Sequence, residues 1–153
     1  MASSIAVDAS VVVRYLTGDD KIQSAAAADL FRAAQSGKVK LVVPTSTIQE
    51  TVYVLERLYN LAAVEIAPKL ISLLTLPNVE TPDYRWVLEA LQFYRAKNSD
   101  FGDALLCAFA RSENCVVTTF DKGMVKKFSE VTVNTPMECL GGKLQGRGKG
   151  GQD

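Results

Sequence analysis

The sequence contains no histidine among its 153 residues. This absence excludes Ser-His-Asp and Cys-His nucleophilic catalysis, and it excludes every metal site that uses imidazole ligands. Cysteine is scarce as well, because the chain has only Cys107, Cys115 and Cys139, without CxxC spacing. We expect these thiols to be reduced and structural rather than metal-binding. Chemistry in this chain must therefore depend on other side chains.

Neither sign of charge is in excess, because 17 Lys and Arg residues balance 17 Asp and Glu residues. The net charge thus argues neither for nor against a polyanionic partner. No segment reaches the roughly 18 uncharged apolar residues that a membrane span requires. The N-terminal segment MASSIAVDAS also lacks the basic start of a signal peptide. These features predict a soluble, cytoplasmic protein with no membrane partner.

The length and the apolar content of 48% are typical of one globular domain, which we expect over residues 1–140. The remaining residues, 141–153, form the Gly-rich basic segment GGKLQGRGKGGQD. This segment is too poor in apolar residues to pack, so we expect it to be disordered.

Apolar segments of strand length alternate with longer segments of helical periodicity. Strands are expected at 4–8, 39–44, 115–119 and 131–135. Helices are expected at 20–36, 47–59, 61–76, 84–97, 101–114 and 122–128, and a short helix closed by Gly18 is expected directly after the first strand. Ser46 and Gln49 have the spacing of a capping box, and Pro68 is expected to kink or divide its helix. Because the strands are nearly all apolar, the pattern predicts a three-layer α/β/α sandwich with a mostly parallel central sheet.

Four acidic residues fall at strand ends or helix starts. Asp8 ends the first strand, Asp121 follows the strand at 115–119, Asp103 lies in the first turn of its helix, and Glu50 lies one turn into another. Ligands of parallel α/β sheets bind outside the carboxyl ends of the strands. We therefore expect these acids to converge if the first strand and the strand at 115–119 are neighbours.

Carboxylates that converge repel one another unless they share protons or bind a cation. An all-oxygen site suits Mg²⁺ or Mn²⁺, which retain waters and bind substrate phosphate oxygens. Without these four acids, 17 bases face 13 acids, so the remaining surface carries about four positive charges. Lys122, Lys126 and Lys127 follow Asp121 and place some of this charge beside the site. An acidic metal site with a basic rim is typical of a phosphodiester substrate.

Each acid also has a structural interpretation. Asp8 could cap the helix that starts near Ser10, Glu50 could be an ordinary solvated helix residue, and Asp121 could be a turn residue. Asp100 is best explained as the N-cap of the helix that carries Asp103.

The chain resembles the PIN-domain ribonucleases, and in particular the VapC-like toxins of bacterial toxin-antitoxin pairs. The resemblance covers nearly the whole domain, from VDASVVVRYL through TSTIQETVYVL to DFGDALLCAFA and VVTTFDKGM. It implies that Asp8, Glu50, Asp103 and Asp121 bind the metal and are catalytic. Ser10 and Thr119 match supporting polar positions, beside the helix cap Asp100. Lys122 and Gly123 follow Asp121 where many relatives have a basic residue and then another acid, so a fifth carboxylate is missing.

The resemblance implies a metal-dependent endoribonuclease that hydrolyses single-stranded or structured RNA, inhibited by an antitoxin protein that binds beside the site. The apolar content of the helices at 47–59 and 61–76 predicts a homodimer. Two other classes stay open. One is a catalytically silent PIN-like module that binds RNA or protein. The other is a receiver-type phosphotransfer domain, which is disfavoured because no strand here ends in lysine.

Overall fold

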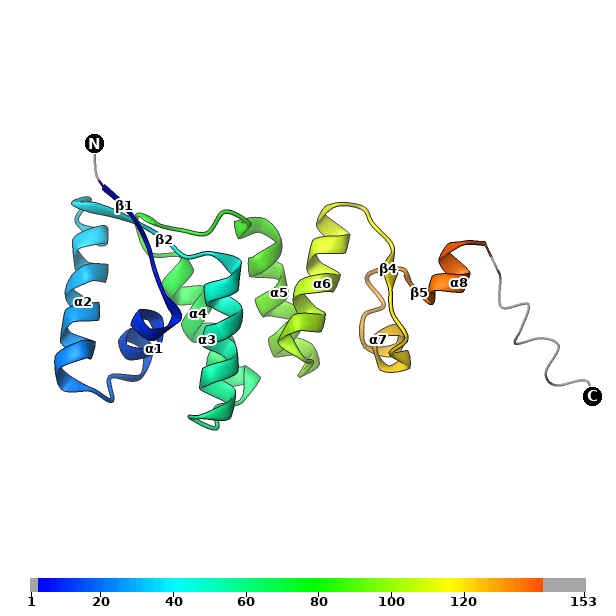
Figure 1. Cartoon of the computed structure of the whole chain (residues 1–153), viewed down its shortest axis with the longest axis horizontal. Coiled ribbons are helices and arrows are strands. Elements are labelled where there is room, and N and C mark those ends of the chain that lie inside the picture. The colour runs from blue at the N-terminus through cyan, green and yellow to red at the C-terminus, as the bar shows by residue number, and fades with distance from the viewer. Residues whose placement is uncertain (1–2, 142–153) are drawn as a thin grey trace, which may run out of the picture.

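The computed structural model describes residues 3–141, so residues 142–153 of the tail expected at 141–153 lie outside this description. Strands and helices alternate along the described residues (Figure 1). In order they are β1 (Ser3–Ala6), α1 (Ala9–Thr17), α2 (Lys21–Gln35), β2 (Val39–Val42), α3 (Thr45–Arg57), α4 (Ala63–Leu74), β3 (Val79–Glu80), α5 (Tyr84–Lys97), α6 (Phe101–Ser112), β4 (Val117–Thr118), α7 (Lys122–Lys127), β5 (Val133–Asn134) and α8 (Pro136–Cys139).

All of the strand pairs within residues 3–141 are parallel. The three-stranded sheet has the order β1-β2-β3, with Ser3 opposite Val39 and Leu41 opposite Val79. β4 and β5 form a second sheet, in which Val117 lies opposite Val133. Parallel strands need long crossover connections, and helices supply them here. The predicted three-layer α/β/α fold with parallel strands is confirmed.

The sheet is divided into two parts. Figure 1 shows β1 and β2 toward one end of the long axis and β4 and β5 toward the other, with α5 and α6 between them. Contacts with α5 explain where the second part lies. Phe128, directly after α7, packs edge-on against Phe93 at 5.8 Å between ring centroids, and Lys97 forms a 2.7 Å ion pair with Glu130. These contacts hold β4 and β5 against the end of α5, so β1 and β4 are not hydrogen-bonded neighbours within the described residues.

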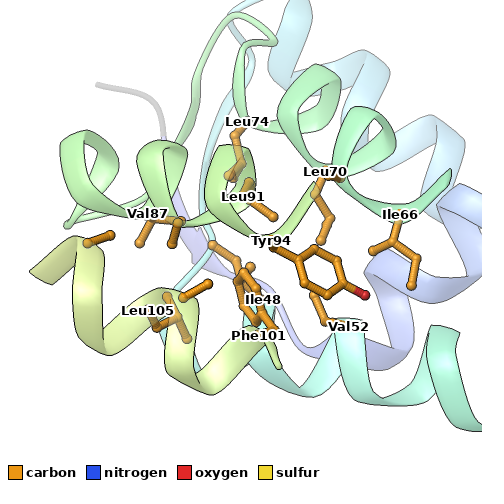
Figure 2. Close-up of a cluster of buried hydrophobic side chains, with 14 of the residues drawn as sticks. Ile48, Val52, Ile66, Leu70, Leu74, Val87, Leu91, Tyr94, Phe101 and Leu105 are labelled. Carbon is orange, nitrogen blue, oxygen red and sulfur yellow. The ribbon is translucent and has the colours of Figure 1, made fainter. Parts of the chain in front are cut away.

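The hydrophobic core is largest where α3, α4, α5 and α6 meet. Figure 2 shows side chains from all four helices directed into one cluster: Ile48, Val52, Ile66, Leu70, Leu74, Val87, Leu91, Tyr94, Phe101 and Leu105. Fully burying a side chain of this size stabilises a fold by about 1.5–3 kcal/mol. The cluster therefore fixes the α5–α6 pair, and with it the start of α6, against α3.

One polar group enters this core. Tyr94 is almost fully buried, and its hydroxyl donates a hydrogen bond to a carboxylate oxygen of Glu56. Burial, with the bond to Glu56 as the second cause, raises the pKa of the Tyr94 phenol. The phenol therefore stays a neutral donor.

One local prediction is wrong, and for Pro68 one of the two expected alternatives is excluded. The capping box of Ser46 and Gln49 does not form, because α3 begins two residues earlier, with Pro44 at the N-cap and no side-chain cap bond. Pro68 does not divide its helix, since α4 continues from Ala63 to Leu74. Proline at this position deprives the carbonyl of Val64 of its helical donor. Val64 is 61% exposed, on the side of the helix that faces water, which makes the loss tolerable.

No helix within residues 3–141 combines the length and the apolar character that crossing a bilayer requires.

Candidate acidic active site

Asp8 stands between β1 and α1. Its side chain accepts hydrogen bonds from the backbone N–H of Ser10 at 3.0 Å and from the Ser10 hydroxyl at 2.6 Å, so Asp8 caps α1. The hydroxyl bond of Ser10, followed by its backbone bond, lowers the pKa of the Asp8 carboxyl. Asp8 is thus an exposed, ionised carboxylate held in one orientation, and the expected contact with Ser10 is present.

Glu50 lies on the exposed side of α3, next to two contacts that position this helix. The buried hydroxyl of Thr47 donates a 2.9 Å hydrogen bond to the carbonyl of Val7, the residue before Asp8. On the other side, the side-chain amide of Gln49 lies beside Gly102. If residue 102 had a Cβ atom, that atom would be 3.5 Å from Nε2 of Gln49. The start of α3 is therefore bounded by the end of β1 and by the first turn of α6.

Asp100 and Asp103 have different environments at the start of α6. Asp100 is the N-cap, and its carboxylate accepts the backbone N–H of Asp103 at 3.1 Å. Asp103 is half-buried. Desolvation by burial, then the charges of Asp100 and Asp121, raise the pKa of the Asp103 carboxyl, while Lys127 opposes them. The net direction at Asp103 is thus toward the protonated form.

Asp121 follows β4 and caps α7. Its carboxylate accepts the N–H of Gly123 at 2.8 Å, and its own N–H donates to the hydroxyl of Thr119 at 3.0 Å. Thr119 is in turn fixed to β5, because its N–H donates to the carbonyl of Asn134 at 3.0 Å. The supporting position expected for Thr119 is thus a backbone contact with Asp121.

The structure brings Asp100, Asp103 and Asp121 into one electrostatic cluster, with Lys127 nearby as expected from its position in the sequence. Asp8 and Glu50 are not among the charges that shift the pKa of Asp103: Asp8 follows β1, and Glu50 lies on α3. Among residues 3–141, no three acidic or cysteine side chains lie close enough to hold one metal ion. The donor atoms suit a hard divalent cation in kind, since all are carboxylate oxygens. The four-acid metal site itself stays a prediction.

Sequence reasoning missed Thr47 and Gln49, whose contacts position α3. Thr47 is one of the few buried polar residues among those described, and it is the first buried residue of α3. The bond that it makes joins residues 40 apart in the chain. A threonine among the apolar positions of a helix is a weak sequence signal for such a bond.

Carboxylates lie after β1, after β4, in the first turn of α6 and one turn into α3, on a parallel α/β fold whose sequence has no histidine. Together they define a class of domains with all-oxygen acidic sites. The chain belongs to the PIN domain family, because the family model of the PIN domain matches residues 5–131. Proteins of this family are generally nucleases, and they typically depend on a divalent metal. The resemblance inferred from the sequence is confirmed at the level of the family.

The solved structures similar to this chain include a toxin-antitoxin complex and an archaeal protein. VapBC2 from Rickettsia felis, bound to a DNA fragment from its promoter, has 12% identity over 86% of this chain and 98% of that chain, with a TM-score of 0.32. PAE2754 from Pyrobaculum aerophilum has 23% identity over 95% of this chain and 99% of that chain, with a TM-score of 0.33. No curated protein matches the sequence at a significant level.

Proposed function

We propose that this protein is a Mg²⁺- or Mn²⁺-dependent endoribonuclease. Membership of a family of nucleases supports this function. The absence of histidine also supports it, because metal binding by this chain must then use mainly carboxylate oxygens. The bases Lys122, Lys126 and Lys127, which follow Asp121, suit a polyanionic substrate.

The observation that carries the proposal is the position of Asp103. Its charge is disfavoured by burial and by two neighbouring carboxylates, and Lys127 is the one base that offsets them in its electrostatic surroundings. A charge in such a position costs free energy unless a cation accompanies it. Residues with charges disfavoured in this way are concentrated at functional sites.

The residues have distinct roles in this proposal. Asp103 and Asp121 hold the cation from one side, and Asp8 and Glu50 complete its ligands from the other. Ser10 orients Asp8 through two hydrogen bonds, and Asp100 caps the helix that presents Asp103. When bound, a divalent ion supplies Lewis acidity for phosphodiester hydrolysis.

Four charge-removing variants test this function: Asp8→Asn, Glu50→Gln, Asp103→Asn and Asp121→Asn. Each keeps the shape of the side chain, and asparagine still caps a helix. We expect each to lose RNA cleavage about a hundredfold or more, with an unchanged circular dichroism spectrum. Asp29→Asn is the matched control, because Asp29 is exposed and pairs with Arg32 at the surface. Cleavage by the wild type that persists in excess EDTA would contradict metal dependence.

The biological role that we propose is that of a toxin inhibited by an antitoxin protein, acting on RNA in the cytoplasm. This role rests on the resemblance of the sequence to VapC-like toxins. The product of a neighbouring reading frame should bind the purified protein and suppress its RNA cleavage. A neighbouring product that binds without changing cleavage would argue against this role.

Homodimer formation is also proposed, on a narrower basis than the sequence suggested. Most apolar side chains of α3 and α4 belong to the core, which removes much of the original reason for a dimer. Tyr53, Leu58 and Val64 are 61%, 75% and 61% exposed and remain available for a second copy. Light scattering should give the mass of a dimer for the wild type and that of a monomer for Tyr53→Glu.

A catalytically silent PIN module is the second candidate. One observation favours it: within residues 3–141, no three acidic or cysteine side chains are close enough to share a metal. Calorimetric titration with Mn²⁺ separates the two functions. Heat that Asp103→Asn abolishes supports the nuclease, and absence of binding by the wild type supports the silent module.

A further inference from the structure

A hollow of about 420 Å³ lies directly beside Asp121. It is formed by the connection from β4 to α7, by β5 and by the start of α8, and it includes the side chains of Phe120, Lys122, Lys126 and Asn134. Its volume is within the range of small-ligand pockets. The hollow is distinct from the acidic cluster, although Asp121 borders both.

Phe120 is the aromatic residue of this hollow, and its side chain is 84% exposed. It makes no aromatic contact with another ring among the described residues, whereas Phe93, Phe101 and Phe109 each pack against one. Aromatic side chains bury large apolar areas when they pack. An aromatic ring that is exposed to water beside a hollow is therefore suited to stack against a planar ligand. Stacked nucleobases are such partners, and stacking tolerates any base.

Lys122 and Lys126 are four residues apart on α7 and therefore lie on the same side of this helix. Neither forms a hydrogen bond or an ion pair within residues 3–141, whereas the adjacent Lys127 donates to the carbonyl of Asn98. Two unpaired ammonium groups beside an exposed ring are a combination suited to a nucleotide, which carries a phosphate next to a base.

Two acids, Asp121 and Glu138, also line the hollow and keep their charge, but hydrogen bonds with backbone N–H groups hold each carboxylate at the start of a helix. Asp121 is engaged in capping α7, and Glu138 is engaged in a capping box with Thr135. Asn134 has its backbone carbonyl fixed by Thr119, which holds the residue in place while its side-chain amide makes no hydrogen bond in the described part of the chain. An amide presents a donor and an acceptor together, as reading the edge of a base requires.

We propose that this hollow binds one nucleotide of single-stranded RNA next to the phosphate that is cleaved. Phe120 stacks on the base, Lys122 and Lys126 contact phosphate, and Asn134 contacts the edge of the base. The inference rests on the proposed nuclease function and adds to it a position at which the substrate is selected.

Fluorescence anisotropy with short labelled single-stranded RNA tests the hollow, using Asp103→Asn as the parent so that binding is measured without cleavage. Adding Phe120→Ala should weaken binding about tenfold, whereas Phe120→Trp should retain it. Tyr84→Ala is the matched control, because Tyr84 is an exposed aromatic residue at the start of α5, outside the hollow, and its loss should leave binding unchanged.

The lysines are tested by the salt dependence of the same binding. Lys122→Gln and Lys126→Gln should each lower the slope of log affinity against log salt by about one phosphate contact. Lys38→Gln, an exposed lysine outside the hollow, should leave the slope as it is. Asn134→Ala should change the order in which oligoadenylate, oligouridylate and oligocytidylate are bound, with little change in the slope.

The outcomes separate this inference from the nuclease function. If the wild type cleaves RNA but Phe120→Ala binds as tightly as its parent, the hollow is not a nucleotide site and the nuclease stands. If the wild type does not cleave but the binding pattern holds, only the nuclease function fails. If Phe120→Ala changes the mass in light scattering and not RNA affinity, Phe120 covers a protein interface and the inference is overturned. Absence of RNA binding by the parent also overturns it.

Discussion

The hydroxyl of Thr47 donates a 2.9 Å hydrogen bond to the carbonyl of Val7, and this contact ties the beginning of α3 to the end of β1. The bond is buried, so it forms away from competing water. Glu50 is one helical turn after Thr47, and Asp8 follows Val7. One side chain that carries no charge thus sets how two of the four candidate ligands lie relative to each other.

Thr47→Val should lower the free energy of unfolding by about 1–2 kcal/mol, because it leaves the carbonyl of Val7 without this donor. The control is Thr51→Val. The hydroxyl of Thr51 bonds the carbonyl of Thr47 within the same helix, where a helical N–H also serves that carbonyl, so the loss should be smaller. Urea unfolding of both variants gives the comparison. Equal losses would show that the Thr47–Val7 bond has no special weight.

Asp100 and Asp103 should respond differently to substitution. Asp100→Asn keeps the cap and should retain stability and some cleavage, whereas Asp100→Ala should lose about 1 kcal/mol. Asp103→Asn should abolish Mg²⁺ binding and nearly all cleavage. Melting temperature, calorimetry and RNA cleavage on the three variants provide the measurements. Equal catalytic collapse in Asp100→Asn and Asp103→Asn, with unchanged melting, would mean that Asp100 is a ligand.

Without metal, Asp103 should destabilise the protein at neutral pH. Its pKa is raised above 3.8 by burial first and by Asp100 and Asp121 next, so the folded state holds this proton more tightly than the unfolded state. The resulting stability is present below pH 3.8 and is lost as the pH rises through the folded pKa. In EDTA at pH 7, Asp103→Asn should therefore melt above the wild type, and the difference should shrink as the pH falls toward 4. A wild type that melts higher at pH 7 would reverse the sign.

The three cysteines should differ in reactivity. Cys115 and Cys139 are exposed, whereas Cys107 is buried, and burial, with Asp103 as the second cause, raises the pKa of its thiol to about 11. Since the thiolate is the reactive form, Cys115 and Cys139 should be alkylated in the native protein and Cys107 only after denaturation. Mass spectrometry of alkylated peptides gives the result. Rapid labelling of Cys107 in the native state would indicate frequent opening of α6.

Much of the site could be predicted locally. Asp100 was expected to be the N-cap of α6, and its bond to the N–H of Asp103 is present, because a cap depends on neighbours within three residues. The contact of Ser10 with Asp8 is of the same kind. The predicted capping box at Ser46 does not form, because α3 starts directly after Pro44 and Ser46 is therefore already inside the helix.

The sequence by itself determined the alternation of strands and helices, the parallel fold and the family, since these depend on apolar periodicity, short-range caps and the order of motifs along the chain. Only the tertiary structure decided where β4 and β5 lie, because Phe93–Phe128 and Lys97–Glu130 join residues more than 30 apart. It also decided that burial and the charges of Asp100 and Asp121 raise the pKa of Asp103. Such balances depend on distances through space and on exclusion of water, which no local pattern of residues encodes.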